Sequence, residues 1–136
     1  MIKNLKRRPK ILLIEDDQST IELYEEVFQR AGFEISTLNW GQKAIELLKE
    51  IREGKKEKPD LILLDLILPD IDGILILKEA RKYPQTENLL IFALTNYTNS
   101  QLDQELIKER IDKILVKTSY PPSKLIATVK EALKIK

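Results

Sequence analysis

The 136-residue sequence contains no cysteine and no histidine. It therefore has no disulfide, no thiolate chemistry, and neither the commonest general base nor the commonest transition-metal ligand. An excess of one charge is also missing, because 23 basic residues balance 22 acidic ones and leave a net charge of +1. This balance argues against nucleic acid as a partner. There is no signal-peptide core and no apolar run long enough to span a bilayer, so we expect a soluble cytoplasmic protein without a membrane partner.

Apolar runs alternate along the chain with segments whose apolar residues recur at helical spacing. The expected strands are Lys10–Ile14, Glu34–Leu38, Asp60–Asp65, Leu89–Thr95 and Lys113–Lys117. The expected helices are Ser19–Ala31, Ala44–Ile51, Gly73–Tyr83, Ser100–Arg110 and Ser123–Lys136. Continuous apolar strands separated by amphipathic helices predict an α/β fold, a doubly wound parallel sheet with helices on both faces. We expect one domain over residues 10–136, preceded by a basic N-terminal arm over residues 1–9.

Polar side chains gather where the predicted strands end. They are Glu15, Asp16 and Asp17 after the first strand, Asp65 after the third, Thr95 at the end of the fourth and Lys117 at the end of the fifth. Each alone has a structural explanation, such as a helix cap for an aspartate or strand propensity for a threonine. In open α/β sheets, however, ligands bind beyond the carboxyl ends of the strands. The joint placement therefore predicts a functional site at this edge.

The residue types at this edge indicate phosphoryl transfer. Clustered carboxylates repel one another and favour a cation, and oxygen ligands without histidine or cysteine suit Mg²⁺ or Mn²⁺. A carboxylate can also act as a nucleophile and become an aspartyl phosphate. The oxygens of a transferred phosphoryl group need positive charge and hydrogen-bond donors, which Lys117 and Thr95 would supply together with the cation.

The motifs "ILLIEDD", "PDLILLDLILPDIDG", "IFALTN" and "ILVK" occur in an order and spacing that resemble a response regulator receiver domain of two-component signalling. The resemblance covers roughly residues 9–136. It implies a flavodoxin-like, five-stranded sheet of order 2-1-3-4-5. It also implies a protein that is not an enzyme beyond catalysing its own aspartyl phosphorylation and dephosphorylation.

The resemblance also assigns roles and partners. Asp65 resembles the phosphoacceptor, Asp16 a direct Mg²⁺ ligand, Glu15 a ligand acting through water, the Ile67 carbonyl a backbone ligand, Thr95 the switch hydroxyl and Lys117 the phosphate-binding lysine. The phosphoryl donor would be the phosphohistidine of a sensor histidine kinase or a histidine phosphotransfer protein. Phosphorylation would switch a face built by the fourth helix, fifth strand and fifth helix. Because the sequence ends directly after the last expected helix, we expect output through another, unknown protein.

Several positions depart from the pattern of the family. Thr118 stands where proline usually follows the lysine across a cis bond, and a non-proline cis bond costs about 3 kcal/mol. Ile114 replaces the usual aromatic switch residue, and Asn96 is larger than the usual residue after the threonine. The usual Gly-Ala before the fifth strand is absent, with Arg110 and Ile111 nearby. These changes affect the expected switch more than the expected phosphorylation chemistry. The alternative is a pseudo-receiver, a protein-binding module that no longer switches, which Mg²⁺ titration would distinguish.

Two other α/β classes fit the residues less well. A flavodoxin-like cofactor carrier would need hydroxyls and amides after the first strand, where Glu15, Asp16 and Asp17 would repel a phosphate. A haloacid-dehalogenase-like phosphatase would need an aspartate at the position of Ile67.

Two features allow more than one interpretation. The basic residues of the N-terminal arm, Lys3, Lys6, Arg7, Arg8 and Lys10, indicate either an anionic contact or a solvated chain end. Trp40, in the loop after the second strand, is either a partner contact or a loop anchor.

Overall fold

The computed structural model describes residues 7–135 of the chain. Its strands are β1 (Lys10–Ile14), β2 (Glu34–Leu38), β3 (Leu61–Leu64), β4 (Ile91–Thr95) and β5 (Lys113–Val116). Its helices are α1 (Gln18–Arg30), α2 (Gly41–Arg52), α3 (Gly73–Arg81), α4 (Ser100–Lys108) and α5 (Pro122–Ala132), with a short 3-10 turn, η1, at Lys117–Ser119. Strands and helices alternate along the chain, as the sequence pattern predicts.

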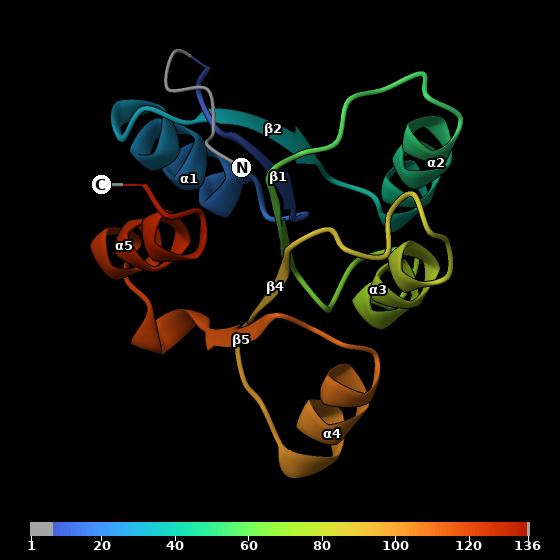
Figure 1. Ribbon diagram of the computed structural model, residues 1–136. Helices are drawn as coiled ribbons and strands as arrows, with labels where there is room; N and C mark the ends of the chain where they lie inside the picture. Colours follow the sequence, from blue (N-terminus) through green and yellow to red (C-terminus); the bar gives the residue numbers. More distant parts are fainter. Residues whose placement is uncertain (1–6, 136) are drawn as a thin grey trace.

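The strands form one parallel sheet in the order β2-β1-β3-β4-β5 within residues 7–135. Helices α1 and α5 lie on one side of the sheet, and α2, α3 and α4 lie on the other (Figure 1). The predicted doubly wound, flavodoxin-like fold of order 2-1-3-4-5 is therefore confirmed. None of the helices within the described residues combines the length and apolar character needed to cross a membrane.

The apolar core consists of two layers, one on each face of the sheet. Side chains alternate along each strand, so Ile11 and Leu13 of β1 point into one layer while Leu12 and Ile14 point into the other. All four residues of β3 are buried in the same alternating way. Burial on both faces explains why β3 has a continuous apolar sequence instead of one that alternates with polar residues.

Several predicted boundaries are wrong by a few residues. The third strand, Leu61–Leu64, stops one residue short of the predicted Asp60–Asp65 at each end, and the Asp60 carboxylate accepts the N–H of Lys10 at 2.7 Å. Helix α3 ends at Arg81 instead of Tyr83, ahead of the proline that follows. The last helix was predicted to run to Lys136. It ends at Ala132, shortly before a residue with a left-handed backbone, Lys134 at φ 58°, and Lys136 itself lies outside the described residues.

The remaining boundary differences are also small. Helix α1 spans Gln18–Arg30, one residue earlier at each end than predicted, and α2 begins at Gly41, three residues before the predicted start. Strand β4 begins at Ile91 instead of Leu89, whose carbonyl bonds a side chain of α3. Strand β5 ends at Val116 because the next residues form η1, and α4 ends at Lys108.

Two basic residues of the arm, Arg7 and Lys10, are paired with carboxylates of the same chain. Arg7 lies 3.0 Å from Asp60, while Lys10 lies 3.8 Å from Glu34 and also forms an ion pair with Glu57. Lys3 and Lys6 lie outside the described residues. An anionic contact of the arm stays a prediction.

A buried arginine connects α3 to the turn between α4 and β5, at the edge of the sheet opposite the predicted site. The guanidinium of Arg81 donates to the carbonyls of Glu87, Leu89 and Arg110 and lies 3.0 Å from the Asp112 carboxylate. Asp112 in turn accepts the N–H of Ile91, the first residue of β4. One side chain therefore joins three chain segments where β4 and β5 begin.

Arg110 adopts a left-handed backbone conformation, with φ at 63°, directly after α4. Such a conformation costs a residue with a Cβ about 1–2 kcal/mol, and glycine is favoured at this position of a helix end. Both Arg110→Gly and Arg110→Ala lose the bond from the Arg110 guanidinium to the Arg81 carbonyl, but only glycine removes the backbone strain. We expect the free energy of unfolding of Arg110→Gly to exceed that of Arg110→Ala, the control, by about 0.5–1 kcal/mol, since glycine also loses more entropy on folding. Urea denaturation measures both, and a glycine variant less stable than the alanine variant would contradict the prediction.

Candidate phosphoryl-transfer and cation site

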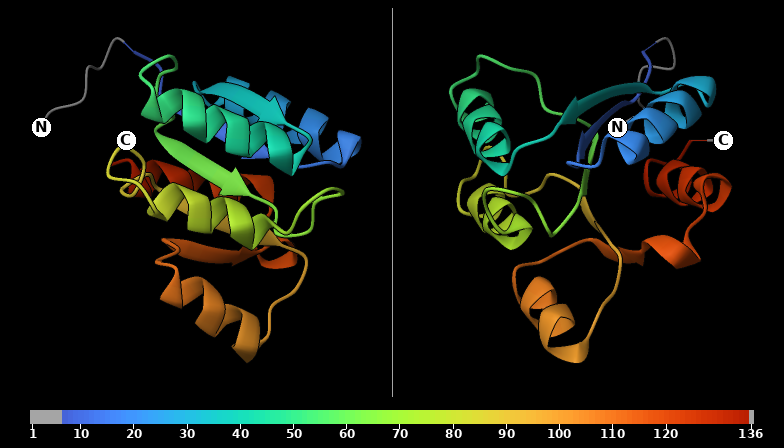
Figure 2. Two further views of the ribbon diagram at one scale, coloured as in Figure 1. Left: turned by 90° about the vertical axis from the view of Figure 1, so that its right-hand side faces the viewer. Right: turned by 180° about the vertical axis from the view of Figure 1, so that it is seen from behind.

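The ends of β1 and β3 lie side by side, which brings two carboxylates together. The strands pair in parallel through Ile14 and Leu64. The N–H of Asp65 donates to the Ile14 carbonyl at 3.0 Å, and the N–H of Glu15 donates to the Leu38 carbonyl at 3.0 Å. The left panel of Figure 2 shows the arrowheads of β2 and β3 pointing to the same side of the molecule. The predicted site residues therefore follow neighbouring strands at one edge of the sheet.

Lys117 joins the two buried carboxylates from the far end of the sequence. Its ammonium nitrogen lies 2.7 Å from Glu15 Oε1 and 3.8 Å from Asp65 Oδ2. Glu15 is only 1% exposed, and its second oxygen accepts the N–H groups of Asp16 and Asp17. Since an unpaired buried carboxylate is costly, Lys117 and these amides are what make the burial of Glu15 tolerable.

The charges at the site shift two pKa values. Burial, followed by the negative charge of Glu15, raises the pKa of Asp65 from 3.8 to about 7, although Lys117 opposes the rise. Burial alone would lower the pKa of Lys117, but its hydrogen bond to Glu15 and the charge of Asp65 outweigh burial, and the net pKa is raised. Lys117 thus stays charged at neutral pH, whereas Asp65 takes up a proton readily unless more positive charge is present.

Three carboxylates at this edge can meet around a cation. One oxygen from each of Glu15, Asp16 and Asp65 lies within 4.8 Å of the others. Asp16 is exposed and the other two are buried, so the cluster opens to solvent on one side. Three negative charges face one ammonium, and all the side-chain donors are hard oxygens. The residues present therefore fit a divalent cation such as Mg²⁺ or Mn²⁺.

Asp17 has a structural role at this edge. Its carboxylate accepts the backbone N–H of Thr20 at 2.9 Å and the Thr20 hydroxyl at 2.6 Å, and so caps the start of α1. These bonds lower the pKa of Asp17. The helix-cap interpretation is therefore the correct one for this aspartate.

Thr95 lies at the end of β4, as predicted, but its hydroxyl is bonded elsewhere. The side chain is 2% exposed, and the hydroxyl donates to the backbone carbonyl of Tyr97 at 2.9 Å. A hydroxyl has one proton to donate. Thr95 would have to release the Tyr97 carbonyl before it could donate to a ligand on Asp65.

The loop between β3 and α3, residues 66–72, is built against Asp65. The N–H of Ile67 donates to Asp65 Oδ1 at 3.2 Å, and Ile67 pairs with Asp72 across the loop as an isolated antiparallel bridge. At the base of the loop, the N–H of Gly73 donates to the Leu66 carbonyl at 2.8 Å. A Cβ on Gly73 would lie 2.5 Å from the Asp65 carbonyl oxygen, so only glycine allows this close return of the chain.

Asp70, at the tip of this loop, is a site residue that the sequence did not reveal. Its two carboxylate oxygens accept the N–H groups of Gly41 and Gln42, each at 2.8 Å. These bonds lower the pKa of Asp70 against the opposing effect of burial. In the described structure Trp40, at the N-cap position of α2, makes no side-chain capping bond. The helix starts with Trp40 at the N-cap, one residue after Asn39, so the sequence alone gave no sign that a distant group supplies the cap.

The positions that depart from the family pattern are also clear in the structure. No peptide bond within residues 7–135 is cis, so the bond after Lys117 is trans, and Lys117 itself begins the turn η1. Ile114 is half-buried against the core layer that contains Leu106. Trp40 is 44% exposed at the start of α2, close to the site edge.

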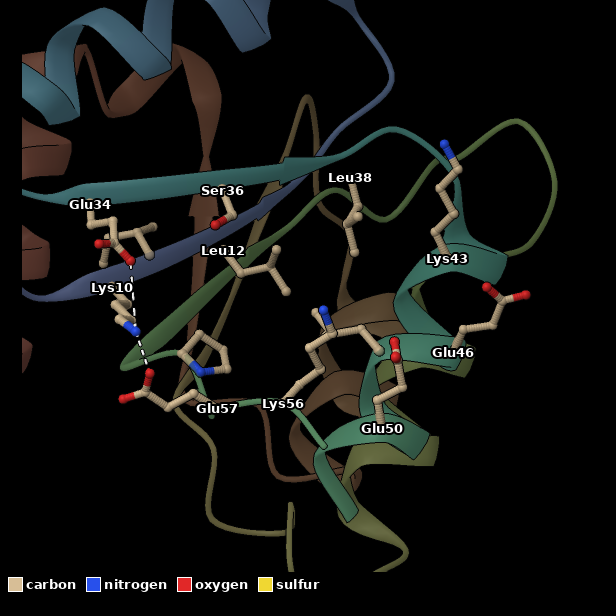
Figure 3. A pocket seen from close by; sticks show the side chains of 13 residues that line it. Lys10, Leu12, Glu34, Ser36, Leu38, Lys43, Glu46, Glu50, Lys56 and Glu57 are labelled. Carbon is tan, nitrogen blue, oxygen red and sulfur yellow. Dashed lines mark hydrogen bonds and ion pairs between the residues drawn. The ribbon is translucent and has the colours of Figure 1, made fainter. Parts of the chain in front are cut away.

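A separate groove of about 600 Å³ lies between α2 and the edge strand β2 (Figure 3). Its floor includes Leu12, Leu38 and Leu47. At one end Lys10 bridges Glu34 and Glu57 (Figure 3). Within the described part of the chain, the residues that line this groove include none of the strand-end residues of the predicted site.

A five-stranded α/β sheet of this order with an acidic cluster and a lysine at its carboxyl edge defines a signalling receiver. The family model of the response regulator receiver domain matches residues 11–130, and the chain belongs to that family. It is therefore a receiver domain of two-component signalling.

Individual relatives agree with this assignment. The chain is 32% identical to the phosphate regulon transcriptional regulatory protein PhoB of Rhizobium meliloti over 93% of its own length and 52% of that protein. Among solved structures, the phosphorylated cyanobacterial phytochrome response regulator RcpA superposes with a TM-score of 0.78 at 28% identity, covering 93% of this chain and 91% of that one. The Mn²⁺-bound form of the response regulator Rcp1 gives 0.78 at 25% identity, covering 90% and 92%. The chain spans about half the length, or less, of the first curated relatives that it matches.

Proposed function

We propose that this chain accepts a phosphoryl group on Asp65 from the phosphohistidine of a sensor histidine kinase or a histidine phosphotransfer protein. The observation that carries the proposal is the position of Asp65. It is a buried carboxylate directly after β3, with the Lys117 ammonium at 3.8 Å and with oxygens of Glu15 and Asp16 close by. A phosphorylated structural relative, RcpA, supports the proposal.

In the proposed reaction an oxygen of the Asp65 carboxylate attacks phosphorus. One P–O bond forms as the P–N bond of the phosphohistidine breaks, and the imidazole leaves with that electron pair. Lys117 offsets negative charge on the phosphoryl oxygens, and Thr95 donates its hydroxyl proton to one of them after releasing the Tyr97 carbonyl. The same residues would serve the later hydrolysis, so the chain catalyses its own phosphorylation and dephosphorylation without being an enzyme for another substrate.

The cation of the proposed site is Mg²⁺, with Mn²⁺ as a substitute, and the Mn²⁺-bound relative Rcp1 supports this choice. Asp16, Asp65 and the Ile67 carbonyl would hold the ion directly, and Glu15 would hold it through water. When bound, it supplies positive charge against the phosphoryl oxygens.

The proposed output is a change in the surface formed by α4, β5 and α5. Thr95 ends β4, which pairs with β5 through Thr95 and Val116. A shift of the Thr95 hydroxyl toward the site would therefore act next to β5, and a partner protein would read the change. The domain that switches would be residues 10–136, and no role is proposed for nucleic acid or membranes as partners of this domain.

Incubation with Mg²⁺ and acetyl phosphate, followed by intact mass spectrometry, tests the proposal. We expect the mass of one phosphoryl group to be added, and the addition to be lost in Asp65→Asn and after chelation of the metal. Asp72→Asn, which changes an exposed aspartate in the same loop, is the matched control and should be phosphorylated normally. No mass change with either acetyl phosphate or a phosphorylated histidine donor would refute the proposal and favour the non-switching binding module.

A further inference from the structure

The loop that follows Asp65 is held at two places, and only one of them is local. Its base is closed by the bond from Gly73 to Leu66 and by the bridge between Ile67 and Asp72. Its tip is held by the Asp70 carboxylate, which accepts two N–H groups at the start of α2, 28 and 29 residues earlier in the chain. Helices α2 and α3 lie on the same face of the sheet, so the tip reaches α2 across that face (Figure 1).

The contact between the loop tip and α2 is tight as well as polar. A Cβ on Gly41 would lie 2.3 Å from Cγ1 of Ile71, the residue after Asp70. The glycine therefore lets the tip approach the helix end closely enough for both carboxylate oxygens of Asp70 to be used. The charge of the carboxylate also suits the positive end of the helix dipole.

Ile67 belongs to the base of this loop and stands three residues before Asp70 at the tip. Its N–H contacts the Asp65 carboxylate at 3.2 Å, and its side chain is 59% exposed and makes little packing that could hold the backbone in place. The position of the Ile67 backbone is therefore set by the two anchors of the loop. Loss of the tip anchor leaves the base intact, so the backbone would become less well placed without losing the loop altogether.

We infer that Asp70 is a positioning residue for the Asp65 site: by binding the start of α2 it fixes the loop that carries the Ile67 amide and carbonyl against Asp65. The inference deepens the proposed function and rests on it for the role of the Ile67 carbonyl as a cation ligand. Loss of the Asp70 anchor should also loosen the Ile67 amide against Asp65, and this change does not depend on whether the carbonyl binds a cation. Groups that orient the ligands of a metal typically change its affinity about 10- to 100-fold when removed. Removal of the Asp70 carboxylate should lower the affinity of the site for a divalent cation about five- to tenfold, at or below that range, since the base of the loop remains closed.

The test compares three variants with a matched control. Asp70→Ala removes the anchor, and Asp70→Asn keeps an oxygen that can accept an N–H group, as asparagine does at helix caps. The double variant Trp40→Ser with Asp70→Ala gives α2 a local cap but leaves the loop unattached. Asp72→Ala removes the neighbouring aspartate, whose side chain makes no capping bond to α3 in the described structure.

Three measurements separate a positioning role from a purely structural one. They are the thermal unfolding midpoint, the hydrogen-exchange rate of the Ile67 amide, and the Mn²⁺ dissociation constant from calorimetry. In Asp70→Ala we expect a lower midpoint, an Ile67 amide that exchanges about tenfold faster, and Mn²⁺ binding weakened about five- to tenfold. In the double variant the midpoint should recover while exchange and Mn²⁺ binding stay impaired. Asp72→Ala should resemble the wild type in all three, and Asp70→Asn, which keeps one of the two acceptor oxygens, should lie between the wild type and Asp70→Ala.

The inference is overturned if Trp40→Ser restores Ile67 exchange and Mn²⁺ binding together with the midpoint, because Asp70 would then act only as a helix cap. It is equally overturned if Asp70→Ala leaves Ile67 exchange unchanged. Neither result depends on phosphorylation. A wild-type chain that acetyl phosphate and a histidine donor both fail to phosphorylate would refute the proposed function, and Ile67 exchange would still decide the role of Asp70.

Discussion

Replacement of Lys117 by methionine should slow phosphorylation of Asp65 by acetyl phosphate on the order of a hundredfold or more, as expected for loss of a positive group that stabilises a transition state. It should also destabilise the metal-free protein by about 2–4 kcal/mol at neutral pH, because a buried charge is left without its partner. The buried partner is Glu15, whose oxygen lies 2.7 Å from the Lys117 ammonium. Both losses follow from one side chain that serves two carboxylates.

Two further variants separate the effects. Glu15→Gln combined with Lys117→Met removes the unpaired buried charge and should recover much of the lost stability, although phosphorylation should stay slow. Lys113→Met, which changes an exposed lysine of β5, should behave like the wild type. Urea denaturation and the rate of mass increase measure the two quantities. A Lys117→Met protein as stable as the Lys113→Met control would show that Lys117 does not stabilise Glu15 in the fold.

The second prediction concerns the pH dependence of stability without a divalent cation. The pKa of Asp65 is about 7 in the fold against an ordinary value of 3.8. At a pH between these two pKa values, Asp65 holds a proton in the native state that it has lost in the unfolded chain. The free energy of unfolding therefore falls as pH rises through this window and levels off above it. We expect the metal-free wild type to lose about 1–3 kcal/mol relative to Asp65→Asn between about pH 4 and pH 7.5.

Chemical denaturation across this pH range in the presence of a chelator measures the effect. At neutral pH, Asp65→Asn should be the more stable protein, even though it lacks the proposed phosphoacceptor. Millimolar Mg²⁺ should flatten the curve of the wild type, since the cation replaces the proton, and should leave Asp65→Asn nearly unchanged. Parallel curves for wild type and Asp65→Asn in chelator would mean that Asp65 is not destabilised by its surroundings.

The fold and the main site were largely predictable because their signals lie within short segments of sequence. The continuous apolar residues of β3 predict a strand buried on both faces, and Asp65 marks its end. The strand order 2-1-3-4-5 came from resemblance to the family and was confirmed in the structure. The acidic cluster and Lys117 followed from the rule that the carboxyl ends of parallel strands share one edge.

The features that the sequence did not reveal depend on contacts between distant segments. Asp70 caps a helix 29 residues earlier, and Arg81 bonds carbonyls that become neighbours only after β4 and β5 are in place. The hydroxyl of Thr95 donates to the carbonyl of Tyr97 because the conformation of the loop after β4 places that carbonyl next to it. The spacing of apolar residues in a sequence indicates burial and the type of secondary structure. These side-chain bonds depend instead on which backbone groups the tertiary fold brings within about 3 Å of the side chain.

The ion pair between Glu15 and Lys117 joins residues 102 positions apart, one directly after β1 and one in the turn after β5. A partly unfolded chain that has lost β1 or β5 therefore has no complete site. Cation binding at this edge would favour the fully assembled sheet by mass action, so an added divalent ion should raise the cooperative unfolding temperature of the whole domain. Binding of the ion would thus report the fraction of molecules in which the ends of β1 and β3 lie side by side.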